Sequence, residues 1–289
     1  MLTLTNLRKT FAPGTVNEKT ALDGINLHLA PGDFVTVLGS NGAGKSTTIK
    51  AILDLIRKDD GTVTFWGRKL SDSKQLKEDI GVVFEQGNFY ETLTSTQIGS
   101  ISAAAYTQWD QKVYEGYLER FQLPKDKALK TLSNGMRTKL GIAVALSHHP
   151  KLLILDEATS GLDPVVREDI LDVFWEFVQD EHHSILMSSH ITSDLEKIAD
   201  YITFLHQGKL LFCKPKDELR YQYGVLRCGQ AQFGRLDPSE ILACRKEPCQ
   251  IDVLVADKEA ARRRHPDMVV DDAAIDDILL LYVKGERMK

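Results

Sequence analysis

The sequence predicts an α/β fold: a sheet core covered by helices, with a helical insertion and a small carboxyl-terminal appendage. Up to about residue 212, short β-rich runs alternate with helical patterns, which is typical of a sheet covered by helices. Strand signals stop between about residues 87 and 147, and the composition shifts near Lys214–Lys216. We therefore expect a core domain over residues 1–214 and an accessory α/β domain over residues 215–289.

Short, continuous apolar runs define the strands of the predicted core. Asp33–Gly39 is the first buried strand, and Ser46–Ile56 is the helix that follows it, ending before a turn-forming Asp-Asp-Gly sequence. Further core strands are expected at Lys151–Leu155, Ser184–Ser188 and Ile202–Leu205.

The insertion and the appendage have their own patterns. Trp109–Phe121 carries apolar and aromatic residues at helical spacing, which indicates a mostly helical subdomain over about residues 87–147. The aromatic stripe is interpreted as packing rather than as a ligand site. In the appendage, Gln250–Ala256 alternates as a strand should, and helices are expected at Asp257–His265 and Ala273–Val283.

Composition and sequence pattern argue against a nucleic-acid binder, a membrane-spanning chain, a secreted protein and a metal site. The formal net charge is −5 with both signs interspersed, whereas a dedicated nucleic-acid binder usually has a basic face. No apolar stretch approaches the roughly 20 residues that span a bilayer, and Met1–Thr5 does not begin a secretory signal. The protein is expected in the cytoplasm, with any membrane role requiring a separate partner. No Cys-x-x-Cys pair or His cluster suggests a metal site, so reduced thiols are expected at Cys213, Cys228, Cys244 and Cys249.

The first site signal is Gly39–Ser46, which fits the Walker A phosphate loop. Glycines let backbone N–H groups point at phosphate oxygens, and the following helix presents its positive end to the same anion. Lys45 is expected to reach the β- and γ-phosphates of ATP, and the Ser46 hydroxyl to bind Mg²⁺. An accidental match is the alternative, and the position between a predicted strand and a predicted helix argues against it. The expected nucleotide-binding residues are Gly39, Ser40, Asn41, Gly42, Ala43, Gly44, Lys45, Ser46 and Thr47.

The second signal is the apolar run Leu152–Leu155, which ends in Asp156 and Glu157. Two carboxylates at the end of a buried strand are costly unless they have a function. Asp156 is expected to hold Mg²⁺, and Glu157 to orient and deprotonate the attacking water. Two acids in an ordinary surface turn would be the alternative, and the phosphate loop upstream favours the functional reading.

Further motifs resemble those of the ABC ATPases. Leu132–Met136 resembles the ABC signature motif, Ser160–Asp163 resembles the D-loop, and Ser189-His190 resembles the segment with the switch histidine. Phe11 stands where that family places an aromatic residue that stacks on adenine. The order and spacing match over about residues 1–212. The resemblance implies a P-loop ABC ATPase core, which is a mixed sheet with RecA-like helices, plus the helical subdomain.

The resemblance also implies an assembly of two copies. In ABC proteins the signature serine contacts the γ-phosphate bound by the other copy, so Ser133, Asn134 and Gly135 would face the ATP of a second ATPase copy in a homodimer. It further implies that His190 holds the γ-phosphate and the attacking water, and that Asp163 couples the two sites. Asn134 and Met136 depart from the usual Gly and Gln, but backbone contacts with an anion survive both changes.

At one position of the resemblance, this chain has a charged residue where the family usually has a neutral one. Alignment of Ile80–Phe84 with the family's strand places Glu85, rather than Gln86, at the position of the Q-loop glutamine. A shift by one residue would restore Gln86, but the following residues fit without a gap. Glu85 can still bind Mg²⁺, although it adds negative charge beside the triphosphate.

Two short sequence segments indicate which group of ABC proteins this chain resembles. Gly81–Tyr90 and Ser188–Asp200 resemble bacterial ABC-2 type exporters of peptides and antibiotics. The alternative is a non-transport ABC ATPase of the translation or DNA-repair type. Against it, Lys45–Ser133 leaves room only for a small helical subdomain, and the chain has one ATPase core.

The resemblance therefore implies an ATP-hydrolysing subunit on the inner face of the bacterial cell membrane, attached only through a separate integral membrane permease subunit. The candidate contact surface for that permease is the groove around Glu85–Thr96, where Phe89, Tyr90 and Leu93 are unusual apolar residues for a loop. Packing between subdomains explains these residues equally well.

Overall fold

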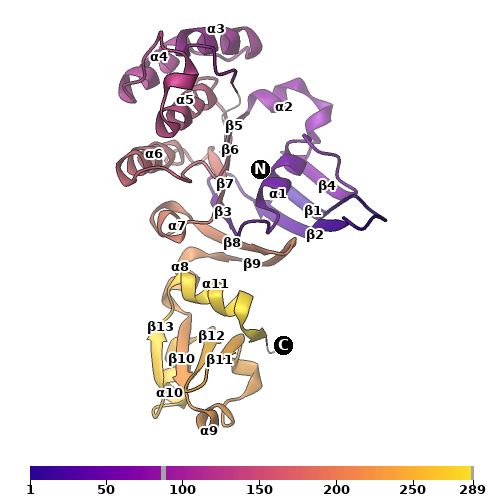
Figure 1. Cartoon of the computed structure of the whole chain (residues 1–289), viewed down its shortest axis with the longest axis vertical. Helices are drawn as coiled ribbons and strands as arrows, with labels where there is room; N and C mark the ends of the chain where they lie inside the picture. The colour runs from indigo at the N-terminus through magenta and orange to yellow at the C-terminus, as the bar shows by residue number, and fades with distance from the viewer. Residues whose placement is uncertain (86–88, 288–289) are drawn as a thin grey trace. The chain divides into compact units, whose positions relative to one another are not determined.

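A six-stranded sheet forms the centre of the first of two units, Met1–Cys213; the second unit is Lys214–Lys289 (Figure 1). The computed structural model describes residues 1–85 and 89–287. The strands lie in the order β5-β6-β7-β3-β8-β9. Their bounds are Phe34–Leu38 for β3, Ile80–Phe84 for β5, Leu152–Asp156 for β6, Ser184–Ser189 for β7, Tyr201–His206 for β8 and Lys209–Pro215 for β9.

Parallel pairing joins the first five strands in that order, and every residue of β3, β6 and β7 is buried. Helices cover both faces: α1 (Lys45–Ile52) lies on one side, and α6 (Pro164–Phe177) and α7 (Thr192–Ile198) lie on the other (Figure 1). Burial on both faces explains why these strands are continuous apolar runs in the sequence.

The last strand runs the other way. Only Gln207 and Gly208 connect β8 to β9, and both have positive φ angles, 47° and 75°. A two-residue connection can join only antiparallel strands. The sheet is therefore mixed, and the predicted α/β fold class with a mixed sheet is confirmed.

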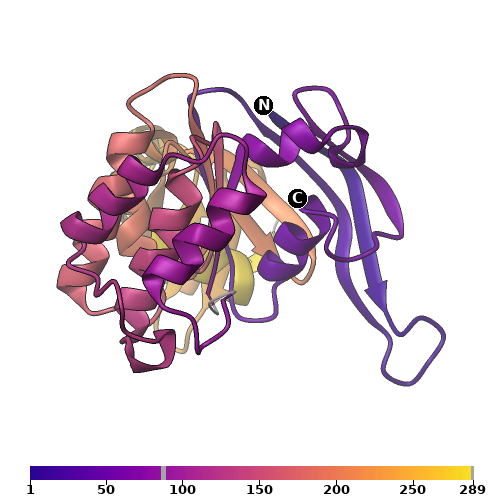
Figure 2. The same ribbon diagram turned by 90° about the horizontal axis from the view of Figure 1, so that it is seen from above.

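A second sheet of the first unit has the order β2-β1-β4 and is antiparallel. Its strands are Leu2–Phe11 (β1), Lys19–Leu29 (β2) and Asp60–Phe65 (β4). The inward residues of β1 pack in the same apolar core as α1. Beyond that core, the hairpin between β1 and β2 extends away from the rest of the unit, and residues 12–18 at its tip are exposed (Figure 2).

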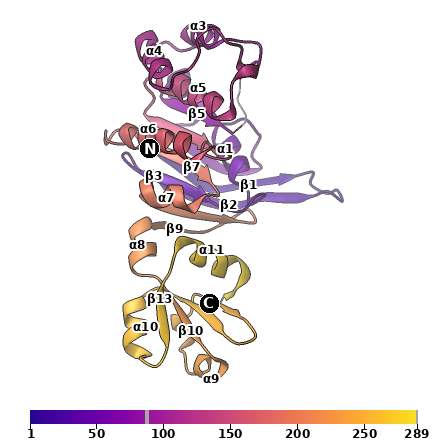
Figure 3. The ribbon, with the colours of Figure 1, turned by 60° about the vertical axis from the view of Figure 1, so that its left-hand side comes forward.

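Helices occupy the region between β5 and β6, and α5 packs against β5 (Figure 3). Their aromatic side chains pack together, as predicted: the ring centroids of Trp109 and Tyr114 are 5.0 Å apart. Tyr114, which was absent from the predicted stripe, is the most buried of these residues, and its hydroxyl donates to the carbonyl of Ser95 at 2.7 Å. The helices of this region are Ser95–Ala105 (α3), Gln111–Arg120 (α4) and Asn134–Leu146 (α5), with a 3-10 turn at Leu129–Thr131. A 3-10 turn at Leu70–Asp72 and the helix Lys74–Glu78 (α2) lie before them, between β4 and β5.

The first helix is shorter than predicted, because it ends at Ile52 rather than Ile56. Asp54 adopts a left-handed conformation with φ 58°, and the N–H groups of Asp54 and Leu55 bond back to the carbonyls of Ala51 and Lys50. This arrangement closes a helix in the manner usually supplied by glycine. An aspartate in that role gives no strong sequence signal.

The second unit is the predicted small α/β appendage. Its antiparallel sheet has the order β13-β10-β12-β11-β14; α10 packs on β10 and β13, and α11 packs on β11 and β12. The strands are Gly224–Cys228 (β10), Ala243–Lys246 (β11), Ile251–Val255 (β12), Val269–Asp272 (β13) and Glu286–Arg287 (β14). The helices are Lys216–Tyr221 (α8), Gln230–Phe233 (α9), Lys258–Arg264 (α10) and Ile275–Lys284 (α11), with a 3-10 turn at Pro238–Glu240. No helix among the described residues is long and apolar enough to cross a membrane.

A buried histidine follows α5. The His148 ring is 1% exposed and stacks on Tyr106 with centroids 4.0 Å apart, and its Nε2 lies 3.2 Å from the carbonyl oxygen of Ile80. Burial lowers the pKa of His148, and the carbonyls of Ile80 and Val144 offset this only in part. On acidification the unfolded chain therefore binds this proton first, so the residue destabilises the fold progressively below about pH 6.5.

We expect His148→Gln to flatten the dependence of unfolding free energy on pH between 7.5 and 5.5. The variant should be less stable at pH 7.5, because it loses the stacking contact. The measurement is urea unfolding followed by tryptophan fluorescence, since all three tryptophans (Trp66, Trp109 and Trp175) lie in the first unit. His182→Gln is the control, because its side chain is 79% exposed. Equal pH slopes in His148→Gln and the wild type would contradict the assignment.

Candidate functional site

The predicted site residues follow neighbouring parallel strands. In the strand pairing, Leu38 is opposite Ser189, Asp156 is opposite Ser188, and Phe84 is opposite Asp156. The segments that begin at Gly39, Glu157, His190 and Glu85 therefore leave the sheet at one edge. In open α/β sheets this carboxyl edge is where ligands bind.

The loop after β3 approaches other parts of the backbone so closely that two of its positions must be glycine. A Cβ atom on Gly39 would stand 2.4 Å from the carbonyl oxygen of Leu205, and one on Gly44 would stand 2.6 Å from that of Ala21. Gly44 also has φ 114° and precedes α1 without a side-chain cap. The first N–H groups of α1 are thus presented to the loop, which fits a phosphate group.

Lys45 is held inside this loop by three acceptors. Its Nζ donates to the carbonyls of Gly39 at 2.7 Å and Ser40 at 3.3 Å, and lies 3.0 Å from Oε1 of Glu157. The Lys45 and Glu157 side chains are only 5% and 9% exposed. Removing either partner of such a pair leaves an uncompensated buried charge, at a cost of about 3–5 kcal/mol. The two predicted catalytic residues therefore depend on each other.

Asp156 lies between two hydroxyl groups. Ser46 Oγ donates to its Oδ1 at 3.1 Å, and Ser188 Oγ donates to the same oxygen at 2.7 Å. Among the described residues, no three His, Cys, Asp or Glu side chains gather as a metal cage. A hydroxyl beside one carboxylate nevertheless fits Mg²⁺, which proteins usually hold with one or two carboxylates together with substrate phosphates.

Glu157 combines a strained backbone with a fixed side chain. Its φ is 54°, and its N–H faces both the carbonyl (3.2 Å) and the hydroxyl (3.0 Å) of Ser188. Its Oε2 lies 2.5 Å from Nδ1 of His190, whose side chain is 43% exposed. Because a carboxylate only accepts, Nδ1 carries the hydrogen of this bond. The pair joins a buried carboxylate to a ring that is partly open to solvent.

Three of the predicted site residues, Ser133, Asn134 and Gly135, lie at the start of α5 rather than at the loop after β3. Ser133 caps α5, its Oγ accepting from the N–H of Met136 at 3.3 Å, and Gly135 lies against Val166 of α6. No hydrogen bond or ion pair within the described parts of the chain joins Ser133, Asn134 or Gly135 to the loop after β3. Ser133 and Asn134 are exposed, so they face outward from their own copy.

One carboxylate oxygen of Asp163 caps a helix. Its Oδ1 accepts from the N–H groups of Val165 at 3.1 Å and Val166 at 3.0 Å, which caps α6. The side chain is exposed, and Pro164 follows at the first helical position. The Asp-Pro pair is a helix-start signal in its own right.

Phe11 lies at the end of β1 with 42% of its surface exposed, opposite Lys19 of β2. The Lys19 Nζ would be 4.0 Å from a Cβ on Gly42, so this exposed ammonium adds positive charge at the rim of the phosphate loop. Lys19 could not be predicted from the sequence, because it lies on β2 and has no fixed spacing from the loop after β3. A basic residue opposite the predicted aromatic one was the available signal.

Glu85 is exposed and follows β5, one position beyond the residue opposite Asp156. Gln86, the alternative at this position, lies outside the described residues. A groove of about 700 Å³ runs past Glu85 and Phe89 between the sheet and the helices. Its other walls include Tyr106, Asn134 and Arg137 of the helical region and Ser160, Gly161 and Leu162.

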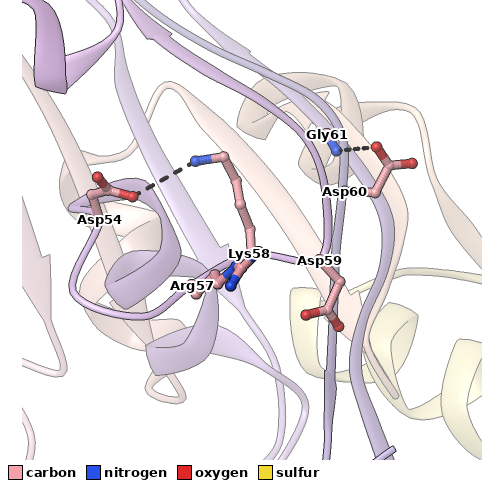
Figure 4. Close-up of a pocket in the computed structure, with 6 residues that line it drawn as sticks. All are labelled: Asp54, Arg57, Lys58, Asp59, Asp60 and Gly61. Carbon is pink, nitrogen blue, oxygen red and sulfur yellow. Dashed lines mark hydrogen bonds and ion pairs between the residues drawn. The ribbon is translucent and has the colours of Figure 1, made fainter.

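A second depression, of about 490 Å³, lies at the far end of α1 from the phosphate loop (Figure 4). It is lined by Asp54, Arg57, Lys58, Asp59, Asp60 and Gly61, and Lys58 pairs with Asp54 at 3.7 Å. It contains none of the predicted site residues, and its mixed charges give it no preference for an anion.

Comparison with known proteins gives one consistent result. A family model described as ABC transporter matches residues 22–160. The lantibiotic transport ATP-binding protein SrtF of Streptococcus pyogenes is 34% identical over 75% of this chain and 92% of its own length. The bacitracin transport ATP-binding protein BcrA of Bacillus licheniformis is 35% identical over 69% of this chain and 66% of its own. Among solved structures, cbiO1 of Clostridium perfringens, part of the ABC transporter complex cbiONQ, is 27% identical, with a TM-score of 0.63 over 75% of this chain and 89% of that one.

The position of Lys19 leads to a test of the loop. We expect Lys19→Gln to weaken nucleotide binding about two- to fivefold at low salt, because an exposed charge contributes modestly and is screened. Lys50→Gln, at an exposed position in the last turn of α1, is the matched control. The measurement is titration with a fluorescent ATP analogue at two salt concentrations. Equal affinities for the two variants at low salt would remove Lys19 from the site.

Proposed function

The chain belongs to the ABC transporter family as an ATP-binding, ATP-hydrolysing subunit, and we propose that two copies of it close over ATP to drive a bacterial exporter of peptides or drugs. The observation that carries the proposal is the buried convergence of Lys45, Ser46, Asp156 and Glu157 with His190 at one edge of the sheet. Export is supported by the relatives named for lantibiotic and bacitracin transport.

ATP binding changes the partners of Lys45 in this proposal. The loop over Gly39–Thr47 holds the phosphates with its N–H groups, and Lys45 exchanges Glu157 for the β- and γ-phosphate oxygens. The exchange frees the Glu157 carboxylate for chemistry. Phe11 stacks on the adenine ring, since its exposed face lies on the strand end that also carries Lys19.

Mg²⁺, held by Ser46 Oγ and Asp156 with Glu85 as a further oxygen ligand, would neutralise charge on the phosphates. The strand pairing supports this set, because Glu85 follows β5 and Asp156 is the last residue of the neighbouring β6. Ser188 Oγ also donates to Oδ1 of Asp156, at 2.7 Å, and holds the carboxylate in place. This positioning matters, because a rigid carboxylate presents its oxygens without first losing conformational freedom.

Hydrolysis uses Glu157 as the general base. The carboxylate takes a proton from water, the water oxygen attacks the γ-phosphorus, and the bond to the β–γ bridging oxygen breaks to release ADP and phosphate. His190 orients Glu157 through Nδ1, at 2.5 Å, and its exposed side reaches the γ-phosphate and the water. Lys45 stabilises the charge on the phosphate oxygens that surround the reacting bond.

A second copy completes the site. Ser133 and Asn134 are exposed at the start of α5 and Gly135 follows them, and N–H groups at a helix amino terminus suit an anion. In the proposed homodimer they contact the γ-phosphate of the other copy, and Asp163 couples the two sites across the interface. ATP favours the closed state, because both copies bind its phosphates.

The membrane partner is a separate integral permease subunit, which would hold this subunit at the inner face of the bacterial membrane. The groove past Glu85 and Phe89 is the proposed contact surface. Tyr90 beside it is 83% exposed, which is unusual for a large aromatic residue that has no partner to bind. Aromatic residues of this kind often dominate the binding energy of an interface.

We expect Glu157→Gln to trap an ATP-bound dimer, because glutamine cannot accept the proton. Light scattering should show a doubled mass with ATP and a single mass with ADP. Adding Ser133→Arg should abolish the doubling, whereas Ser100→Arg, at an exposed serine of α3, should not. A Glu157→Gln protein that turns over ATP normally, or stays single with ATP, would refute these roles.

The permease is tested by recovery of tagged Glu157→Gln protein, with ATP, from detergent-solubilised native membranes. A stoichiometric multi-span membrane protein should accompany it and be identified by mass spectrometry. Tyr90→Asp should reduce that recovery about tenfold or more, whereas Trp175→Asp, on α6 with 54% exposure, should leave it unchanged. Recovery of ribosomes or DNA-repair proteins, without a membrane protein, would overturn the transport proposal.

A further inference from the structure

A cluster of buried polar atoms without hydrogen-bond partners lies beside the catalytic loop. Four such side-chain atoms occur in the described residues, and three of them belong to Thr159, Arg167 and Asp194. Thr159 is 1% exposed and Asp194 is 2% exposed, while Arg167 NH1 lies 3.8 Å from Asp194 Oδ1. That distance is beyond a hydrogen bond. The mechanism above uses none of these residues.

The cluster joins three segments that the mechanism does use. Thr159 follows Glu157 by two residues, and Asp194 is in the first turn of α7, which begins two residues after His190. Arg167, on α6, donates from NH2 to the carbonyl of Leu162 at 3.2 Å, next to Asp163. One small group of side chains therefore connects the Glu157 loop, the His190 segment and the Asp163 loop.

The unpaired atoms are chemically complementary. Arg167 Nε is a donor, Asp194 Oδ2 is an acceptor, and the Thr159 hydroxyl can be either. Leaving such groups buried and unpaired costs about 1–3 kcal/mol each, and a small shift of α6 toward α7 would pair them. Burial raises the pKa of Asp194, and Thr159 and Arg167 offset this only in part. An arrangement that paired these atoms would therefore have more hydrogen bonds than the one observed.

We propose that Asp194 and Arg167 are positioning residues, and that their closure with Thr159 fixes the segments of Glu157, His190 and Asp163 relative to one another during hydrolysis. The proposal rests on the roles given above to Glu157 and His190. Neither residue touches the phosphate loop, so both act through the segments that they hold.

A purely structural pair would behave differently, and the chain provides the comparison. Lys197 and Glu168 also join α7 to α6, with Nζ and Oε2 2.5 Å apart, but both side chains are about half exposed (52% and 53%). Glu168→Gln therefore removes an exposed link between the same two helices and leaves the three buried side chains in place. If a general loosening of α6 and α7 caused the loss of activity, Glu168→Gln would lower kcat as well.

The experiment measures ATPase kcat and KM, and stability to urea, for the full chain carrying Asp194→Asn, Arg167→Lys or both. We expect each single variant to lower kcat about tenfold or more, the loss typical of a small misplacement of catalytic groups, with KM within about twofold of wild type. The double variant should be no worse than Asp194→Asn alone, because one unit is being broken. Glu168→Gln should leave kcat unchanged.

The proposal is overturned by wild-type kcat in Arg167→Lys, by an equal loss in Glu168→Gln, or by a defect in KM alone. If Asp194→Asn does not fold, Arg167→Lys decides the matter, since it keeps the positive charge but not the planar group that reaches Leu162. Glu157→Gln, measured in parallel, distinguishes a failure of the proposed catalytic roles from a failure of the positioning role. Normal turnover in that variant would refute the proposed catalytic roles themselves, whereas its inactivity beside normal Asp194 and Arg167 variants would refute only the positioning role.

Discussion

The parallel pairing of β5, β6, β7 and β3 is the constraint from which the site follows. Each strand ends at the same edge, so Glu85, Asp156, Ser188 and the phosphate loop meet although they are far apart in the sequence. Burial of β3, β6 and β7 on both faces leaves the Lys45 and Glu157 side chains at this edge only 5% and 9% exposed. In such surroundings Lys45 and Glu157 interact strongly, and neither can be exposed or neutralised without disturbing the other.

Features set by local spacing could be predicted from the sequence. The phosphate loop, the Asp156-Glu157 pair and the buried strands depend on a few consecutive residues, and the structure has the loop and both acids at the edge of the confirmed fold. Features set by pairing could not be predicted. Lys19 reaches the rim of the loop from another sheet, and Asp194 meets Arg167 only because α6 and α7 pack together. The early end of α1 was missed because Asp54, rather than a glycine, takes the left-handed conformation.

Besides the packing of α5 on β5, side-chain contacts with α6 link the helical region to the sheet. Gly135 lies against Val166, Lys139 pairs with Asp169 at 2.7 Å, and Arg120 makes a two-armed ion pair with Glu176. The helix that Asp163 caps thus carries contacts from both ends of the helical region. A movement of that region would be transmitted along α6 to Arg167, which holds the loop that precedes the helix.

The backbone of Glu157 has a consequence for how this sequence can evolve. A left-handed φ of 54° disfavours a long side chain, and glycine or asparagine would relieve roughly 1 kcal/mol or more of strain there. That gain is smaller than the cost of about 3–5 kcal/mol for leaving the buried Lys45 charge without its partner. A more stable fold would therefore require Lys45 to be replaced as well, so two positions must change together before the strained residue can be lost.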